Sequence, residues 1–99
     1  MVRILKKRGR DRLHVVAEIL DIAEEGVLKT QIMYRANLSY TLLTDYLRFM
    51  LKSRLLEKRT YKGQVVFKST PKGINFLQRY REITDIIHAE EEGESEGEL

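Results

Sequence analysis

Residues 30–52, TQIMYRANLSYTLLTDYLRFMLK, decide how this chain folds. Apolar residues recur in this stretch at the three- and four-residue spacing of buried helix faces: Ile32, Met33 and Ala36 first, then Leu43, Leu47 and Met50. Between the two sets, residues 37–39 are polar at both ends, as in a tight turn. We therefore predict two helices that pack across each other, with Thr30 and Ser39 as N-caps and the second helix running to Lys52.

The second helix keeps a narrow polar stripe on the side that faces away from the core. Its members follow one another at helical spacing: Thr41, Thr44, Asp45, Arg48 and Lys52. Leu42, Tyr46 and Phe49 form a second apolar row beside the core residues. The stripe is either the solvated face that any amphipathic surface helix needs or, in a helix-turn-helix, a surface that contacts a ligand.

The chain on either side of this stretch adds a helix before it and a hairpin after it. Residues 11–24 carry an apolar stripe that ends before Gly26, and Val27 and Leu28 offer a very short extended piece. Two strand-like segments, 55–60 and 65–69, follow the second helix. Between them Gly63 tolerates the positive φ of a turn, whereas Lys62 suits the tightest turns poorly and favours a longer loop.

This order of elements predicts a winged helix-turn-helix, in the α+β class and mostly helical, with a C-terminal dimerisation helix. Thr70 and Pro71 open that last helix as N-cap and first residue. We divide the chain into four parts: a basic arm at residues 1–10, the winged domain at 11–70, the C-terminal helix at 71–89 and a disordered acidic tail at 90–99.

The last helix carries more apolar residues than a small domain needs. They are spaced by four, three and four residues, as in a coiled-coil seam: Phe76, Tyr80, Ile83 and Ile87. Such a set often packs within its own domain, but a terminal helix has only one side to bury there. The surplus favours a homodimer through this helix.

Composition excludes several classes of protein. Without cysteine there is no disulfide, Cys-ligated zinc, iron–sulfur cluster or thiol nucleophile, and His14 and His88 are too isolated to indicate a metal. No phosphate-binding loop or nucleophile–base pair is recognisable, so we expect no enzyme, no cofactor and no small-molecule effector. No apolar run is long enough for a membrane span or a signal peptide, so we expect a cytoplasmic protein.

Charge is distributed very unevenly. All 18 Lys and Arg residues lie in residues 1–89 with only 9 of the 15 acidic residues, which gives this part a net charge of +9. The other six acidic residues are the glutamates of residues 90–99. A body this basic suits the neutralisation of phosphates, although solubility alone also favours charge. Double-stranded DNA is the partner that we predict.

The same residues resemble a known family, the small archaeal winged-helix proteins of the ten-kilodalton chromosomal type. The similarity covers about residues 6 to 87. It rests on three segments: Lys6-Lys7-Arg8-Gly9, Ile32 to Tyr40 and Thr70-Pro71-Lys72-Gly73. The run Leu43-x-x-x-Leu47-x-x-Met50, followed by Leu55-Leu56, is similar to the winged-helix core of many prokaryotic regulators. The resemblance implies DNA binding and a dimer held by antiparallel pairing of the last helices. Arg54 stands where many such sequences have a turn glycine, so the exit from the preceding helix is expected to differ.

Five residues of the second helix are candidates for reading DNA. Tyr40, Thr41 and Thr44 lie near its N-terminal end, the part of a recognition helix that reaches base edges and flanking phosphates. Arg48 suits guanine or phosphate because its planar guanidinium fits either. Asp45 repels phosphate, and it either accepts from a cytosine amino group or orients Arg48.

The arm and the hairpin are predicted to hold the DNA backbone. The basic candidates are Lys6, Lys7, Arg8, Arg10 and Arg12 in the arm, and Arg59 and Lys62 in the hairpin, with Lys58 and Lys68 behind them. Gln31 and Arg35 of the first short helix are further candidates for the adjacent backbone. An alternative holds for each group, because basic residues also keep an arm soluble and protect an exposed strand edge from aggregation.

The sequence thus predicts a double-stranded DNA-binding protein, either a transcriptional regulator or a chromosomal protein. The alternative is a winged-helix adaptor that binds other proteins in a transcription-related assembly. The two differ in one expectation: Arg48→Glu weakens DNA binding in the first and leaves it unaltered in the second.

Overall fold

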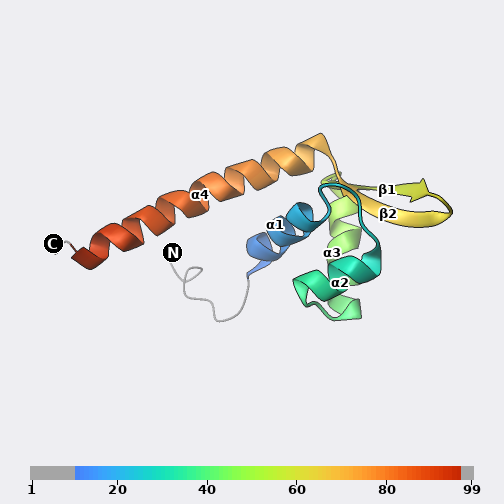
Figure 1. The fold of residues 1–99 in the computed structure, drawn as a ribbon, viewed down its shortest axis with the longest axis horizontal. Helices are drawn as coiled ribbons and strands as arrows, with labels where there is room; N and C mark the ends of the chain where they lie inside the picture. The colour runs from blue at the N-terminus through green and yellow to red at the C-terminus, as the bar shows by residue number, and fades with distance from the viewer. Residues whose placement is uncertain (1–10, 97–99) are drawn as a thin grey trace.

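The computed structural model describes residues 11–96, and side chains up to Glu90. Six elements follow one another along the chain: α1 (Arg12–Ile22), α2 (Lys29–Ala36), α3 (Tyr40–Lys52), β1 (Leu56–Tyr61), β2 (Gln64–Ser69) and α4 (Pro71–Glu96). The three short helices form a cluster, the hairpin projects from one end of it, and α4 leads away towards the other end (Figure 1). This is the α+β, mostly helical winged helix-turn-helix that the sequence predicts.

A single apolar core joins the three short helices, the base of the hairpin and the start of α4. The largest side chains in it are completely or almost completely enclosed: Ile19, Leu20, Ile32, Leu43, Met50 and Leu56. Leu77 brings α4 into the same cluster. The predicted core faces of α2 and α3 are confirmed, since Ile32, Leu43 and Met50 all lie within this core.

The first two helices begin in different ways. Asp11 caps α1 by accepting a hydrogen bond from the His14 backbone N–H at 2.8 Å. In α2 the prediction of Thr30 as N-cap is wrong, because the helix begins two residues earlier than that cap implies, at Lys29. Its N-cap residue is Leu28, whose backbone N–H donates to Oε1 of Gln31 at 2.9 Å. The Gln31 side chain thus takes over the capping role from the helix interior.

The turn between α2 and α3 has the form that the sequence predicts. Asn37 ends α2 in the left-handed region, at φ +54°, and Leu38 is buried between its polar neighbours. Ser39 then caps α3, because its Oγ accepts from the Leu42 N–H at 3.1 Å. The cap places the first residues of α3 at an exposed end of the domain.

Arg54 ends α3 with the hydrogen bonds that a glycine usually permits. Its φ is +62°, its N–H donates to the Leu51 carbonyl, and the Leu55 N–H donates to the Met50 carbonyl at 2.9 Å. These are the two bonds of a Schellman ending. The expectation of a different exit from this helix is therefore wrong: the geometry is the usual one, with arginine in the left-handed position.

The hairpin is tighter than predicted. Tyr61 pairs with Gln64 in the antiparallel register, so only Lys62 and Gly63 form the turn. Both have positive φ, +49° and +79°, as a two-residue turn that matches the strand twist requires. The expected longer loop is wrong because Lys62 adopts the left-handed conformation. At the hairpin's base, Val27 bridges Phe67 of β2, which confirms the short extended piece after α1.

The start of α4 is fixed closely against the end of α3. Thr70 Oγ1 accepts from the Gly73 N–H at 3.0 Å and donates to the Arg54 carbonyl at 2.7 Å. Gly73 is buried, and a Cβ there would overlap the Leu55 carbonyl oxygen, so this helix turn has room only for glycine. The predicted Thr70–Pro71 start of the helix is confirmed.

α4 continues to Glu96 instead of ending near residue 89. The expectation of disorder from residue 90 therefore does not describe residues 90–96, which are helical. Glutamate is a good helix former, and propagation from a helix that packing has already nucleated needs only a favourable propensity at each step. Among the described residues, no helix is long and apolar enough to cross a membrane.

Candidate nucleic-acid interface

The polar stripe of α3 lies on the surface, as predicted. Thr41, Asp45 and Arg48 are exposed and Thr44 is half-buried. Arg48 donates to Asp45 Oδ1 at 3.4 Å, one helical turn away. Because both side chains are mostly exposed, this pair holds Arg48 only loosely, and the guanidinium is accessible to a ligand.

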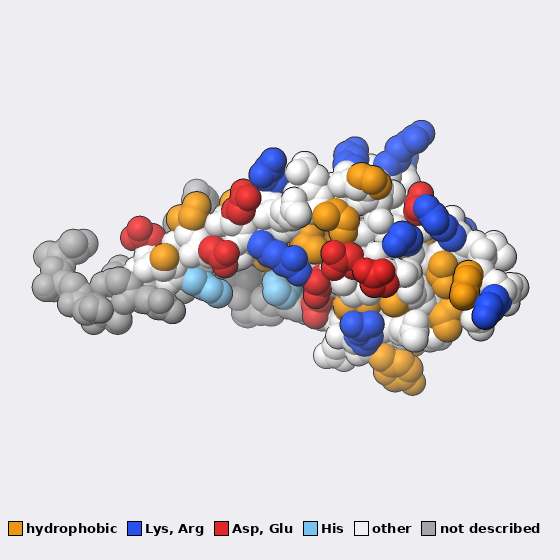
Figure 2. Space-filling view, turned by 45° about the horizontal axis from the view of Figure 1, so that its top comes forward, with side chains coloured by type: hydrophobic (Ala, Val, Ile, Leu, Met, Phe, Trp, Pro, Cys, Tyr) orange, Lys and Arg blue, Asp and Glu red, His pale blue; other side chains and the backbone are white. Residues whose placement is uncertain are grey.

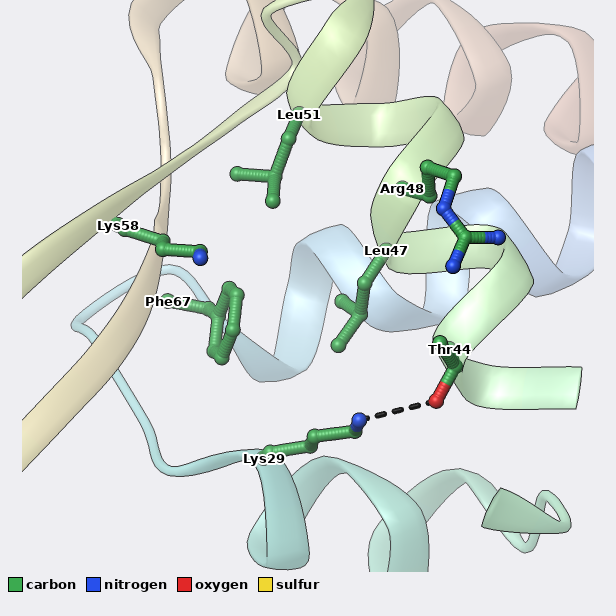
Figure 3. Close-up of a pocket in the computed structure, with 7 residues that line it drawn as sticks. All are labelled: Lys29, Thr44, Leu47, Arg48, Leu51, Lys58 and Phe67. Atoms are coloured by element: carbon green, nitrogen blue, oxygen red, sulfur yellow. Dashed lines mark hydrogen bonds between the residues drawn. The ribbon is translucent and has the colours of Figure 1, made fainter. Parts of the chain in front are cut away.

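A hollow of about 300 Å³ lies beside this stripe, between α2, α3 and the hairpin. Figure 3 shows its lining: Lys29 from α2, Thr44, Leu47, Arg48 and Leu51 from α3, Lys58 from β1 and Phe67 from β2. Three elements thus each contribute one cation around an apolar floor. The arrangement suits a negatively charged group that lies across the helix and the hairpin.

Lys29 makes the most specific contacts in the hollow. Its Nζ donates to Thr44 Oγ1 at 2.9 Å and lies 4.0 Å from the centre of the Tyr40 ring (Figure 3 shows the first contact). A hydrogen bond from Lys29, together with its positive charge, lowers the pKa of the Tyr40 phenol. The first residue of α2 thereby contacts two of the residues predicted to read DNA.

Thr44 uses its hydroxyl group within the protein. Besides accepting from Lys29, its Oγ1 donates to the Tyr40 backbone carbonyl at 2.8 Å. A hydroxyl has one proton to donate and two lone pairs. In this arrangement Thr44 keeps one acceptor position for a ligand and no donor.

The predicted basic residues of the hairpin differ in their contacts. Arg59 forms an ion pair with Glu57 of the same strand at 2.7 Å. Lys62 is at the exposed tip, 5.4 Å from the centre of the Tyr61 ring, and Lys68 donates instead to the Glu24 carbonyl at 3.1 Å. On the face that Figure 2 shows, Lys and Arg side chains stand out at the hairpin end of the molecule. Lys68 thus joins the hairpin to the turn that follows α1, whereas Lys58, at the edge of the hollow, and Lys62 are exposed.

Of the five arm residues predicted to contact DNA, the structure places only the last one. Lys6, Lys7, Arg8 and Arg10 lie outside the described residues, and only Arg12 can be located. It begins α1 and lines a second hollow, of about 360 Å³, with four residues of α3: Leu42, Asp45, Tyr46 and Phe49. Arg12 therefore lies on the other side of the α3 stripe from Lys29.

Sequence reasoning missed Lys29. The signal available was a lysine at the start of a short helix, where the helix dipole is unfavourable to a cation. A lysine is informative in this way only if α2 begins at Lys29. Because Thr30 was predicted as the N-cap, Lys29 was placed outside the helix. Its partners Tyr40 and Thr44 are eleven and fifteen residues away, which no local spacing rule connects.

The apolar residues of α4 divide into two groups. Phe76 and Tyr80 pack against the core of their own chain, and Tyr80 shares a 3.2 Å hydrogen bond with Nδ1 of His14. Partial burial, with a smaller effect of the Asp11 charge, raises the pKa of Tyr80. Of the other two predicted seam residues, Ile83 is 55% exposed and Ile87 is half-buried. Ile86, which was not predicted as part of the seam, is 64% exposed. Arg81 of α4 still pairs with Asp21 of α1 at 2.6 Å, so Ile83 is exposed because of the face of α4 that it occupies and not because the contact with α1 has ended.

A family model described as a winged helix-turn-helix matches residues 9–88. The chain belongs to this family. Two uncharacterized proteins of Methanocaldococcus jannaschii are relatives. One is 30% identical over 85 residues, which are 85% of this chain and 84% of that protein. The other is 31% identical over 80 residues, 80% of this chain but only 36% of that longer protein. The resemblance to small archaeal winged-helix proteins is confirmed.

Solved structures share the fold at low sequence identity. The DNA-binding protein Sso10a-2 from Sulfolobus solfataricus superposes with a TM-score of 0.70 and 22% identity, over 88% of this chain and 95% of that one. A MepR variant from S. aureus bound to an oligodeoxyribonucleotide has a TM-score of 0.67 at 13% identity, over 83% and 62% of the two chains. Lactococcus lactis ZitR in complex with DNA has a TM-score of 0.59 at 16% identity, over 95% and 70%.

Proposed function

We propose that this winged helix-turn-helix protein binds double-stranded DNA, as a transcriptional regulator or a chromosomal protein. The observation that carries the proposal is the cationic hollow between α2, α3 and the hairpin, which adjoins the exposed polar stripe of α3. Sso10a-2 is described as a DNA-binding protein, and MepR and ZitR have each been solved with DNA. These three share the fold and add support.

In the proposed complex α3 enters the major groove, with Thr41, Thr44 and Arg48 towards the base edges. Lys58 and Lys62 of the hairpin then lie along the phosphate backbone beside it. The basic residues of the arm, which lie outside the described residues, contribute further phosphate contacts. Phosphate contacts provide most of the affinity, and α3 provides the preference between sequences.

Asp45 limits how strongly α3 can attract phosphates. It carries a negative charge on the proposed DNA-facing stripe and is paired with Arg48 at 3.4 Å. This exposed pairing offsets part of the guanidinium charge and so lowers its attraction for phosphate. The guanidinium stays accessible to guanine or phosphate, so Arg48 contributes to both affinity and selection.

We further propose a homodimer formed through α4. Its 26 residues span about 39 Å, and Ile83 and Ile86 are more than half exposed among the residues that the structure describes. Antiparallel pairing of two such helices would bury both isoleucines and set two α3 helices at a fixed separation. Ile83→Asp would place a charge in that seam and convert the dimer to a monomer, as measured by sedimentation equilibrium, whereas exposed Gln78→Glu would not.

A second candidate function has its own observation. Leu42 and Phe49, 44% and 47% exposed, lie in the hollow that begins at Arg12, and Leu13 next to it is also exposed. This apolar surface favours an adaptor that binds another protein. Phe49→Gln, which removes the apolar side chain without adding a charge, would weaken such binding while leaving DNA affinity intact.

The proposed function is tested by titrating a fluorescent random-sequence duplex with the full chain over a series of salt concentrations. We expect binding that weakens steeply with salt, and an affinity loss of about 1–3 kcal/mol for Arg48→Glu. Arg79→Glu is the matched control: it reverses the same charge on exposed α4, where Arg79 pairs with Glu82. Absence of binding at low salt, or equal losses in the two variants, would contradict the proposal.

A further inference from the structure

The first residue of α2 is a lysine in a place where helix electrostatics disfavour a cation. Backbone N–H groups at a helix N-terminus carry partial positive charge. Lys29 stands there, half-buried, with its ammonium directed across to α3 and not out to solvent (Figure 3). Contacts with α3 must offset this unfavourable position.

Lys29 contacts α3 at two residues that lie one helical turn apart, Tyr40 and Thr44. Lys29 donates to Thr44 and lies over the Tyr40 ring, while Thr44 donates to the carbonyl of Tyr40. The three residues form a closed set in which each contacts the other two. A change of rotamer at either α3 residue would break a contact with Lys29.

We propose that Lys29 is a positioning residue for DNA recognition: it holds Thr44 and Tyr40 in one arrangement, so that Thr44 offers DNA an acceptor and a methyl group but no donor. The proposal rests on the proposed DNA-binding function and deepens it. Lys29 then acts on sequence preference through α3, instead of serving as one more phosphate contact.

This arrangement has a definite chemical consequence. In the major groove, adenine and cytosine present amino groups that donate, and thymine presents a methyl group. The guanine edge presents only the acceptors O6 and N7. Thr44 held by Lys29 therefore accepts from adenine or cytosine, or contacts thymine, and discriminates against guanine. Without Lys29 the Thr44 hydroxyl loses one of the two hydrogen bonds that fix its rotamer. A rotamer that leaves the Tyr40 carbonyl frees the hydroxyl proton to donate to guanine, so this discrimination weakens.

Lys58 provides a matched control within the same hollow. It lines the opposite side, on β1, and belongs to the strand that follows α3. Both lysines carry one positive charge near the proposed path of the DNA. A residue that only neutralises phosphate lowers affinity about equally for all sequences and reduces the salt slope by about one when removed. We expect that behaviour from Lys58→Met and not from Lys29→Met.

The experiment selects duplexes from a random-sequence library with the full chain and its Lys29→Met, Lys58→Met and Thr44→Val variants, and measures salt slopes on the unselected library. At the base positions whose preference Thr44→Val changes, we expect Lys29→Met to reduce the discrimination against guanine about fivefold or more. The salt dependence of DNA affinity in Lys29→Met should equal that of the wild type. Lys58→Met should lower the slope and keep the wild-type base preference.

A second readout needs no DNA. The pKa of Tyr40, followed by site-resolved NMR of labelled tyrosine, should rise in Lys29→Met and stay unchanged in Lys58→Met.

Three outcomes would overturn the proposal. The first is a lower salt slope with unchanged base preference in Lys29→Met, which makes Lys29 a phosphate contact. The second is an unchanged Tyr40 titration in that variant, and the third is a wild-type protein that binds duplexes without any base preference. If the wild type binds no duplex at all, the proposed function itself fails, and the Tyr40 titration still reports whether Lys29 positions α3.

Discussion

The inner and outer faces of α3 depend on different parts of the chain. On the inner face, Leu43 and Met50 are completely enclosed in the core. On the outer face, Thr44 is held by Lys29 of α2, and Arg48 is paired with Asp45 one turn away. The inner face follows from the spacing of apolar residues along α3 itself, whereas the outer face depends on a residue of another helix.

This difference separates stability from recognition within one helix. Replacing an inner residue removes packing that holds three helices together, and replacing an outer residue changes what the helix presents to a ligand. Four substitutions test that separation, in order of decreasing expected effect.

Leu43→Ala should have the largest effect. The side chain is fully enclosed, so its truncation leaves a cavity and should cost about 2–5 kcal/mol of the free energy of unfolding. Urea denaturation followed by circular dichroism measures it. DNA affinity of the folded fraction should stay near the wild-type value. A loss below about 1 kcal/mol would show that the inner face is not part of a packed core.

Ser39→Ala acts at the junction of the two faces. Removing the hydroxyl leaves the Leu42 N–H without its 3.1 Å acceptor, and helix caps of this kind are worth about 1 kcal/mol. Thermal unfolding measures the loss, with Ser53→Ala at the other end of α3 for comparison. Fraying of the first turn should also broaden the NMR signals of Tyr40 and Thr41, whereas signals at Met50 should stay sharp.

Asp45→Asn should leave stability unchanged and increase DNA affinity. The substitution removes a negative charge from the proposed DNA-facing stripe and releases Arg48 from an exposed pair that contributes little to folding. We expect about two- to fivefold tighter binding to a random-sequence duplex at low salt, a gain that added salt removes. Weaker binding would instead show that Asp45 contacts a base or is needed to orient Arg48.

Arg54→Gly should have the smallest effect. Arginine in the left-handed region is strained, and glycine relieves that strain while it adds entropy to the unfolded chain. These opposing changes should leave the free energy of unfolding within about 1 kcal/mol of the wild type, with a slight gain favoured. Denaturant titration checks this, and a large loss would mean that the arginine side chain makes a contact needed for stability.

The elements that local spacing determines were predictable from the sequence. Ser39 as a cap, the core face with Leu43 and the Thr70–Pro71 start of α4 were all predicted, because each depends on residues within one or two helical turns. The tightness of the hairpin was not, since Lys62 occupies a conformation that its residue type disfavours. The C-terminal end of α4 was predicted too early. The charged composition of residues 90–99 was expected to prevent a helix, although glutamate is a good helix former.

Within the candidate site, the sequence predicted which residues are exposed but not how their side chains are arranged. Arg48 and Asp45 were paired correctly because they lie one turn apart. The role of Lys29 depends on how α2 crosses α3, which brings its ammonium to Thr44. The spacing of apolar residues predicts that these helices pack, but it does not predict which polar groups meet at their edge.

The claim that the outer face of α3 binds DNA is tested most directly by NMR. The labelled full chain is titrated with a short duplex, and the signal of every backbone amide is followed. We predict that the largest shifts fall on α3 from Tyr40 to Arg48 and on the hairpin around Lys58 and Lys62, with little change at Ile83. Shifts confined to α4, or to the apolar surface around Leu42 and Phe49, would contradict the claim that the outer face of α3 binds DNA.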